Sequence, residues 1–105
     1  MEFTYGEGEF FESDIHCSGE ICLGEYKLYL KGPQGDLTQS YLPIDKMARL
    51  RLSGQGLEIF IRLSVSHQIN ALIKGRRRRL DELGRDLARR CGLKKRWLVN
   101  EWVPA

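Results

Sequence analysis

The clearest alternation of apolar and polar side chains in this chain lies between residues 57 and 66. One face of this segment is apolar and carries Leu57, Ile59, Ile61, Leu63 and Val65. The other face is polar apart from Phe60, and carries Glu58, Arg62, Ser64 and Ser66. Alternation with a period of two is typical of a strand that buries one face, so we predict a β-strand over residues 57–65.

Shorter extended segments precede this strand. Residues 1–12 place Phe3 and Tyr5 on one face, and we predict an edge strand there. The apolar positions change parity at Gly24-Glu25, between residues 21–23 and 26–30, which predicts two short strands or one sharply bent strand. Further strands are expected over residues 37–42 and 47–52, with turns at residues 32–36 and 53–56.

Residues 69–74 fit either a strand or the first turn of a helix that begins after Ser66. Gly75 and the four arginines after it make a poor helix interior, and arginines near a helix N-terminus oppose the helix dipole. Asp81 and Glu82 are the charges that a first turn favours. We therefore predict that a strand continues to about residues 74–77 and that a helix begins near Arg78.

The segment from Arg78 to Cys91 has the period of an amphipathic helix. Its apolar stripe consists of Leu80, Leu83, Leu87, Ala88 and Cys91. Gly92 is placed to end the helix, with Leu93 folding back on the last turn. Asp81–Arg85 and Asp86–Arg90 have the spacing of helical ion pairs, and Gly84 beside the stripe predicts close approach to a neighbouring element.

The short apolar tail over residues 97–103 is expected to add a final strand or to pack across the helix. Its tryptophans, Trp97 and Trp102, are more typical of a core than of a ligand platform. Together the pattern predicts a mainly β (α+β) fold: a small bent antiparallel sheet or partly open barrel of about six or seven strands, capped by one C-terminal amphipathic helix.

The length of 105 residues predicts one domain spanning residues 1–105. The acidic N-terminus is unlike a signal peptide, and no apolar run approaches the roughly 20 residues of a membrane span. We therefore expect no transmembrane segment and a cytoplasmic location.

Charge is unevenly distributed along the chain. Residues 1–73 hold six Lys and Arg against ten Asp and Glu, a net charge of −4, whereas residues 74–105 hold eleven against four, a net charge of +7. This basic part suggests an anionic partner, and the alternative is a solvated helix surface. The candidate anion-binding residues are Arg76, Arg77, Arg78, Arg79, Arg85, Arg89, Lys94, Lys95 and Arg96.

The remaining reactive side chains do not assemble into a site by spacing. An odd number of cysteines (Cys17, Cys22 and Cys91) argues against a disulfide framework, and Cys91 on the helix stripe is best explained as a small buried apolar residue. The four residues between Cys17 and Cys22 do not match the spacing of a zinc site. We expect no metal, no cofactor and no catalytic residues, and hence no enzyme activity.

Several segments resemble the pleckstrin-homology-like and GRAM-type domains. Residues 19–23 and 26–30 resemble the opening strand pair of that family, and residues 42–47 resemble a later segment in which a proline and an aliphatic residue precede a strand. The 57–65 strand, the 69–74 strand and the 78–91 helix follow in the family's order, so the resemblance covers about residues 17–92. Gly24-Glu25 is short and acidic where phosphoinositide-binding members have a basic loop.

The resemblance implies a noncatalytic binding or scaffolding module. Our first hypothesis is a protein partner, which predicts an exposed apolar groove or sheet edge and weak dependence on salt. The alternative is electrostatic binding of an anionic lipid surface or nucleic acid through the basic residues between Arg76 and Arg96, with an affinity that falls steeply with salt.

Overall fold

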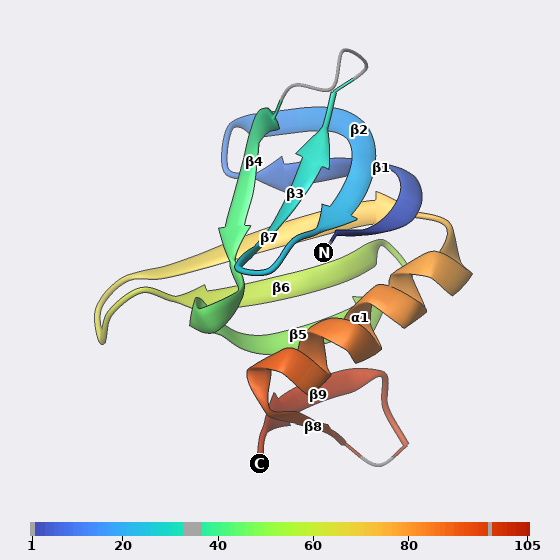
Figure 1. Cartoon of the computed structure of the whole chain (residues 1–105). Helices are drawn as coiled ribbons and strands as arrows, with labels where there is room; N and C mark the ends of the chain where they lie inside the picture. Colours follow the sequence, from blue (N-terminus) through green and yellow to red (C-terminus); the bar gives the residue numbers. More distant parts are fainter. Residues whose placement is uncertain (1, 33–36, 97) are drawn as a thin grey trace.

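The computed structural model describes residues 2–32, 37–96 and 98–105, and for residues 37–40 only the backbone (Figure 1). Within these residues the chain forms nine β-strands, one short 3-10 helix and one α-helix. In chain order they are β1 (Phe3–Glu12), β2 (Ile15–Leu23), β3 (Lys27–Lys31), β4 (Leu37–Pro43), η1 (Ile44–Lys46), β5 (Met47–Ser53), β6 (Gly56–Arg62), β7 (Gln68–Gly75), α1 (Arg77–Cys91), β8 (Leu93–Lys95) and β9 (Glu101–Pro104).

The strands form one antiparallel sheet in the order β4-β3-β2-β1-β7-β6-β5-β9-β8. This sheet does not close, because β4 and β8 stand at opposite ends of the order. The predicted mainly β fold with one amphipathic helix is confirmed, but the described sheet has more strands than the six or seven expected.

The prediction that residues 1–12 form an edge strand is wrong. β1 lies in the middle of the sheet, where it pairs with β2 on one side and, through Gly8–Phe11, with β7 on the other. Gly8 makes this possible, since a Cβ atom there would collide with the backbone of Lys74. Phe3 and Tyr5 are not buried to the same extent: Tyr5 is buried, whereas Phe3 is 47% exposed.

A bulge bends β1 near its start. Gly6 has a φ of 82°, and the register between β1 and β2 shifts between Thr4 and Glu7. Figure 1 shows the result: β3 and β4 run steeply across the direction of β5, β6 and β7. The sheet therefore encloses a core between its two halves.

The helix α1 covers one open side of this core (Figure 1). Leu80, Leu83, Leu87 and Ala88 are buried in the same cluster as Leu57, Ile59 and Ile61 of β6, and Cys91 packs against it while partly exposed. Gly92 ends the helix with a φ of 70° and donates its N–H to the carbonyl of Ala88. The predicted stripe and the predicted helix end are both confirmed.

The boundary between β7 and α1 settles the ambiguity over residues 69–74. They form a strand, which ends at Gly75, and the helix begins at Arg77 rather than Arg78. The first turn therefore contains arginines and no acidic residue, contrary to the expectation from the helix dipole.

The long strand expected over residues 57–65 stops at Arg62. Leu57, Ile59 and Ile61 are buried as predicted, but Leu63 and Val65 are 40% and 99% exposed. The N–H groups of Leu63 and Ser64 both donate to the carbonyl of His67, so the chain turns back before the alternation ends.

The C-terminal segment adds two strands instead of a tail. β9 pairs with β5, β8 pairs with β9, and Trp102 is buried. The possibility of a final strand is thus confirmed. Trp97 and most of the turn expected over residues 32–36 lie outside the described residues. None of the described helices is long and apolar enough to cross a membrane.

Candidate functional site

The four arginines at residues 76–79 lie at the start of α1, and two of them make contacts with neighbouring strands. Arg77 donates from its guanidinium to the carbonyl of Ser53. Arg79 donates to the carbonyl of Thr4 at 3.0 Å and pairs with Glu82 at 3.2 Å. These two side chains reach from the helix to neighbouring strands, and this explains why the helix tolerates arginines in its first turn.

Arg76 and Arg78 differ from these two arginines. Both are exposed, and neither forms an ion pair within the described residues. The run therefore provides two free cations, while its other two members hold the helix onto the sheet.

The arginines along α1 are largely neutralised by the helix itself. Arg85 pairs with Asp81 at 2.6 Å, as the spacing predicts. The predicted Asp86–Arg90 pair does not form, because Asp86 instead accepts a hydrogen bond from the Tyr5 hydroxyl at 2.5 Å and pairs with Arg89 at 3.5 Å. Arg90 lies 5.9 Å above the Phe3 ring and donates to the carbonyl of Gly24.

The Tyr5–Asp86 contact perturbs the tyrosine. Burial, first, and then the hydrogen bond to Asp86 raise the pKa of Tyr5 above its usual range. The hydroxyl therefore stays protonated and joins β1 to the helix. This is the property of a structural contact and not of an acid or base near neutral pH.

The basic residues after the helix lie on the β8–β9 hairpin. Lys94 and Lys95 are exposed and have no ion pair among the described residues. Arg96 binds Glu101 at 2.9 Å, and Arg49 approaches the same carboxylate at 3.9 Å. Glu101 is only 8% exposed, so these arginines neutralise a buried charge.

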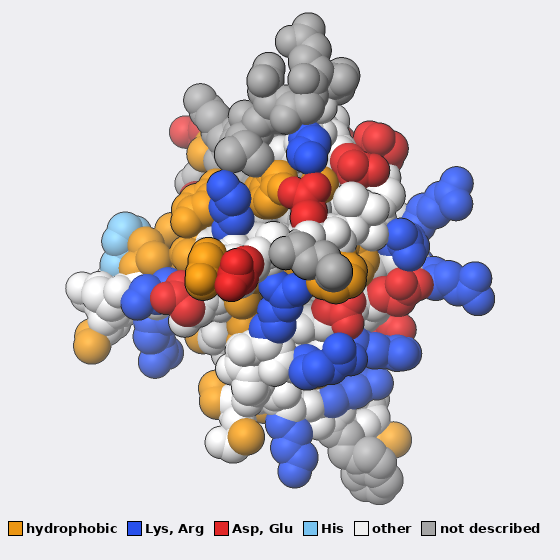
Figure 2. Space-filling view, in the orientation of Figure 1, with side chains coloured by type: hydrophobic (Ala, Val, Ile, Leu, Met, Phe, Trp, Pro, Cys, Tyr) orange, Lys and Arg blue, Asp and Glu red, His pale blue; other side chains and the backbone are white. Residues whose placement is uncertain are grey.

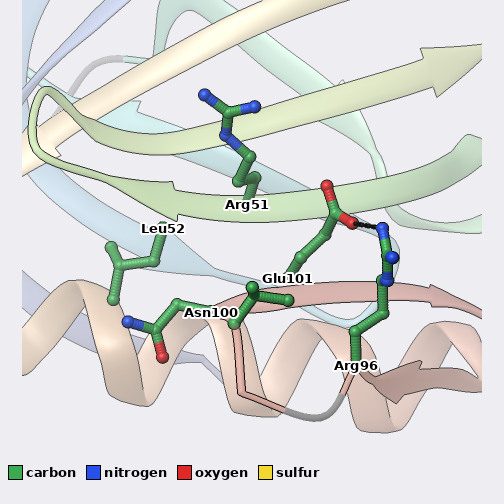
Figure 3. A pocket seen from close by; sticks show the side chains of 6 residues that line it. Arg51, Leu52, Arg96, Asn100 and Glu101 are labelled. Carbon is green, nitrogen blue, oxygen red and sulfur yellow. Dashed lines mark hydrogen bonds and ion pairs between the residues drawn. The ribbon is translucent and has the colours of Figure 1, made fainter.

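A hollow of 340 Å³ lies between the end of β5 and this hairpin (Figure 3). Figure 3 shows the Arg96–Glu101 pair on one side and the Arg51 guanidinium pointing away from it. Arg51 is itself paired with Glu58 at 3.1 Å. The cations of this hollow are thus engaged with carboxylates of the chain and leave little charge for an anionic ligand.

The basic stripe expected from the sequence is therefore not continuous. Its free cations fall into two groups near the two ends of α1: Arg76 and Arg78 lie at its start, and Lys94 and Lys95 follow its end. A helix of 15 residues is about 22 Å long. Figure 2 shows acidic side chains interspersed among the basic ones over the helix.

A second surface, not predicted from the sequence, lies on the outer side of β1, β7, β6 and β5. We call it the outer face and define it by the strand positions that alternate with the buried ones, with Phe60 near its centre. Phe11 is opposite Leu72, Leu72 is opposite Glu58, and Phe60 is opposite Asn70. Phe11, Phe60 and Leu72 are each only partly buried.

Two hollows adjoin on this face and share Phe60. The arginine hollow, of 300 Å³, is lined by Ala48, Arg49, Phe60, Ile61, Arg62, Gln68 and Pro104. The glutamate hollow, of 240 Å³, is lined by Phe11, Glu12, Ser13, Gln55, Glu58, Phe60, Asn70, Ala71 and Leu72. Two cations line the first hollow and two carboxylates line the second, where Glu58 is paired with Arg51.

Contacts within the outer face cover part of its aromatic surface. The Arg49 guanidinium lies 4.1 Å from the centre of the Phe60 ring. His16 stacks on Phe11 with the ring centres 4.3 Å apart, and the Lys74 ammonium lies 5.1 Å from that centre. One signal of this surface is visible in the sequence: Phe60 is the single apolar residue on the polar side of its strand.

The three cysteines are free thiols, of which Cys22 is buried and Cys17 and Cys91 are partly exposed. Burial raises the pKa of Cys22 to about 11, and burial also raises the pKa of Cys91, whose thiol donates to the carbonyl of Ile44. Within the described residues, no three His, Cys, Asp or Glu side chains are grouped as a metal site requires.

No protein-family model, curated protein or solved structure matches this chain.

Proposed function

We propose that this chain is a noncatalytic binding module of pleckstrin-homology-like type, which binds a protein partner on the outer face. The observation that carries the proposal is the pair of hollows that adjoin at Phe60. A partly exposed aromatic ring between one hollow lined by arginines and another lined by glutamates suits a protein surface that presents both apolar and charged side chains.

The order of the elements along the chain supports the pleckstrin-homology-like part of this proposal. Seven antiparallel strands in one bent sheet precede a single amphipathic helix, and this is the order on which the resemblance to the pleckstrin-homology-like domains rests. Fold alone does not define a ligand, so the choice of a protein partner depends on the outer face.

The test compares Phe60→Ser with the native chain and with the double variant Arg76→Ser/Arg78→Ser. Proteins retained by the immobilised native chain are identified, purified and titrated into the ¹⁵N-labelled chain. We expect amide shifts in β6 and β7, loss of retention in Phe60→Ser, and normal retention in the arginine variant. Equal retention by Phe60→Ser would count against the outer face.

Electrostatic binding remains a second candidate because of the free cations at the two ends of α1. It predicts that an inositol polyphosphate or a short DNA duplex shifts the amides of residues 76–96, and that added salt removes the shifts. Arg76→Ser/Arg78→Ser should weaken this binding. Arg85→Ser is the matched control, because Arg85 is already paired with Asp81.

A further inference from the structure

We propose that the turn between β8 and β9 docks onto a lipid surface with anionic headgroups by inserting its apolar side chains. We call the site the hairpin tip and define it as Lys94, Lys95, Leu98 and Val99. The inference goes beyond the proposed function, because it concerns a different surface and a different class of partner. The hairpin tip also differs from Gly24-Glu25, the turn at which phosphoinositide-binding pleckstrin-homology-like domains have a basic loop.

The turn presents two apolar side chains to water. Leu98 is 82% exposed and Val99 is 47% exposed. Figure 1 shows the turn at the lower right, at the edge of the molecule. The N–H of Arg96 donates to the carbonyl of Glu101 at 2.8 Å, and the N–H of Leu52 donates to the carbonyl of Asn100 at 2.8 Å. The turn is therefore fixed at its base while much of its apolar surface remains exposed.

The backbone at Leu98 makes a leucine there unusual. Its φ is 69°, in the left-handed region, which asparagine and glycine adopt more readily than leucine. A large side chain in this region costs free energy, and such residues are concentrated at functional sites. Neither burial nor backbone preference explains the leucine, so we look for its role outside the fold.

Free cations precede the apolar residues. Lys94 and Lys95 are exposed and form no ion pair among the described residues. Side chains alternate along a strand, so the two lysines lie on opposite sides of β8. Residues 93–104 carry three cations and one carboxylate, a net charge of +2. Because that carboxylate, on Glu101, is buried and bound to Arg96, it does not neutralise the lysines.

The spacing of charge and apolar surface matches the layers of a membrane. A strand rises about 3.3 Å per residue, so Lys95 lies at most about 10 Å from Leu98 along the hairpin. The headgroup layer on each side of the hydrocarbon core is about 5–8 Å thick. Lysine side chains can cross part of this layer while their stems contact apolar surface. With Leu98 and Val99 at the outer ends of the acyl chains, the lysines therefore reach anionic headgroups.

The same composition disfavours a nucleic acid at this site. Unpaired bases stack on aromatic rings, and neither Leu98 nor Val99 has one. A phosphate backbone would bind Lys94 and Lys95 and leave the apolar side chains in water. A lipid surface accommodates both parts of the hairpin tip.

The experiment measures co-sedimentation of the native chain with vesicles of phosphatidylcholine, alone or in a two-to-one mixture with phosphatidylserine. We expect at least about tenfold tighter binding to the mixed vesicles, and weaker binding as salt is added. With a nitroxide on the acyl chains near the headgroup, the amides of residues 98–99 should broaden more than those of residues 63–66.

Leu98→Asn separates docking from folding. Asparagine adopts a positive φ more readily than leucine, so the variant should unfold at the same or a higher urea concentration than the native chain. It should nevertheless bind the mixed vesicles about tenfold less tightly. Val65→Asn is the matched control and should bind as the native chain does. Val65 is 99% exposed on the β6–β7 turn, which Figure 1 shows at the left, far from the hairpin tip.

Lys94→Ser/Lys95→Ser tests the charges and should also weaken binding at least about tenfold. Arg76→Ser/Arg78→Ser is the matched control, because it removes two other exposed arginines that form no ion pair with the described residues. It should change the affinity by less than about threefold. Circular dichroism of each variant shows that the fold is retained.

Three outcomes overturn the inference: a native chain that binds neither kind of vesicle, binding that Leu98→Asn leaves unchanged, and equal losses in the lysine and arginine double variants. A protein that binds through Leu98 when vesicles do not bind would assign the hairpin tip to a protein partner instead. Phe60→Ser should bind the vesicles normally, so failure of this inference and failure of the proposed function are distinguishable.

Discussion

At the scale of single residues, Tyr5 joins two parts of the chain that are distant in sequence. Its ring is buried beside the β1 bulge, and its hydroxyl reaches Asp86 in the middle of α1. Burial of a polar group is favourable only when its hydrogen bond is made, and here the acceptor is a carboxylate. The contact therefore helps to hold the helix against the bent end of the sheet.

Replacing Tyr5 by Phe should lower the free energy of unfolding by about 1.5 kcal/mol, because the hydrogen bond to a charged acceptor is lost while the ring remains. Urea unfolding monitored by circular dichroism measures the change. Tyr26→Phe is the matched control, since Tyr26 is exposed and its hydroxyl makes no hydrogen bond to the described residues. Equal effects of the two substitutions would contradict a stabilising role for the Tyr5 hydroxyl.

Cys22 makes stability depend on pH in the alkaline range. Its pKa is raised from 9.0 to about 11 in the folded chain, chiefly by burial, so the unfolded chain loses the thiol proton first. The contribution of Cys22 to stability is therefore complete below pH 9 and is lost as the pH rises toward about 11.

The Cys22→Ala variant isolates this effect from other titrating groups. The difference in the free energy of unfolding between the native chain and this variant should be constant below pH 9 and should shrink above it. Cys17→Ala serves as the control at a partly exposed cysteine. A difference that stays constant through pH 11 would show that burial does not hold the Cys22 proton.

At the scale of elements, the helix and the C-terminal hairpin meet at Gly84. A Cβ atom at this position would lie 2.8 Å and 2.9 Å from two atoms of the Trp102 ring. The close approach expected from a glycine beside the apolar stripe is confirmed. Its neighbour is a side chain of β9, which lies 18 residues further along the chain.

Gly84→Ala should therefore destabilise the protein by about 1–3 kcal/mol, although alanine is the better helix former by about 1 kcal/mol. Thermal or urea unfolding measures the result. Gly54→Ala is the control, since nothing lies within 4 Å of a Cβ atom there. In a Trp102→Leu background the cost of Gly84→Ala should fall, and stabilisation by Gly84→Ala in the native background would contradict the contact.

The elements that could be predicted from the sequence are those whose signal is local. The alternation at residues 57–61 and the stripe from Leu80 to Ala88 depend on neighbours in the sequence, and both identify their elements correctly. The central place of β1 and the pairing of β9 with β5 depend on contacts between distant segments, which periodicity does not encode.

The candidate surfaces follow the same division. The arginine run at residues 76–79 is evident from composition, but the carbonyls of Ser53 and Thr4 that bind Arg77 and Arg79 are known only from the fold. Phe60 is recognisable as an apolar residue on a polar strand face. The hollows on its two sides arise only when five strands, β1, β7, β6, β5 and β9, are brought into register.

At the scale of the whole molecule, the C-terminal hairpin completes the core. Trp102 is buried against the helix, and β9 covers the edge of β5. A chain that ends at Gly92 would expose that edge together with the apolar surface beneath the tryptophan.

We expect Trp102→Ala to lower the free energy of unfolding by about 3–5 kcal/mol, as large core truncations do, and a chain that ends at Gly92 to be less stable still. Urea unfolding and amide hydrogen exchange of β5 measure both effects. Trp102→Phe, which keeps most of the buried area, should retain more of the stability than Trp102→Ala. Cooperative unfolding of the shortened chain at the native midpoint would contradict this role of the hairpin.

An open sheet leaves its last strand available to a passing chain, and here that strand is β8, which has only three residues. Two of them are Lys94 and Lys95, both exposed. Short terminal strands that carry lysines discourage the edge-to-edge pairing of sheets that leads to aggregation. These two lysines thus have a use that requires no ligand: they keep a sheet with unclosed ends from growing into an aggregate.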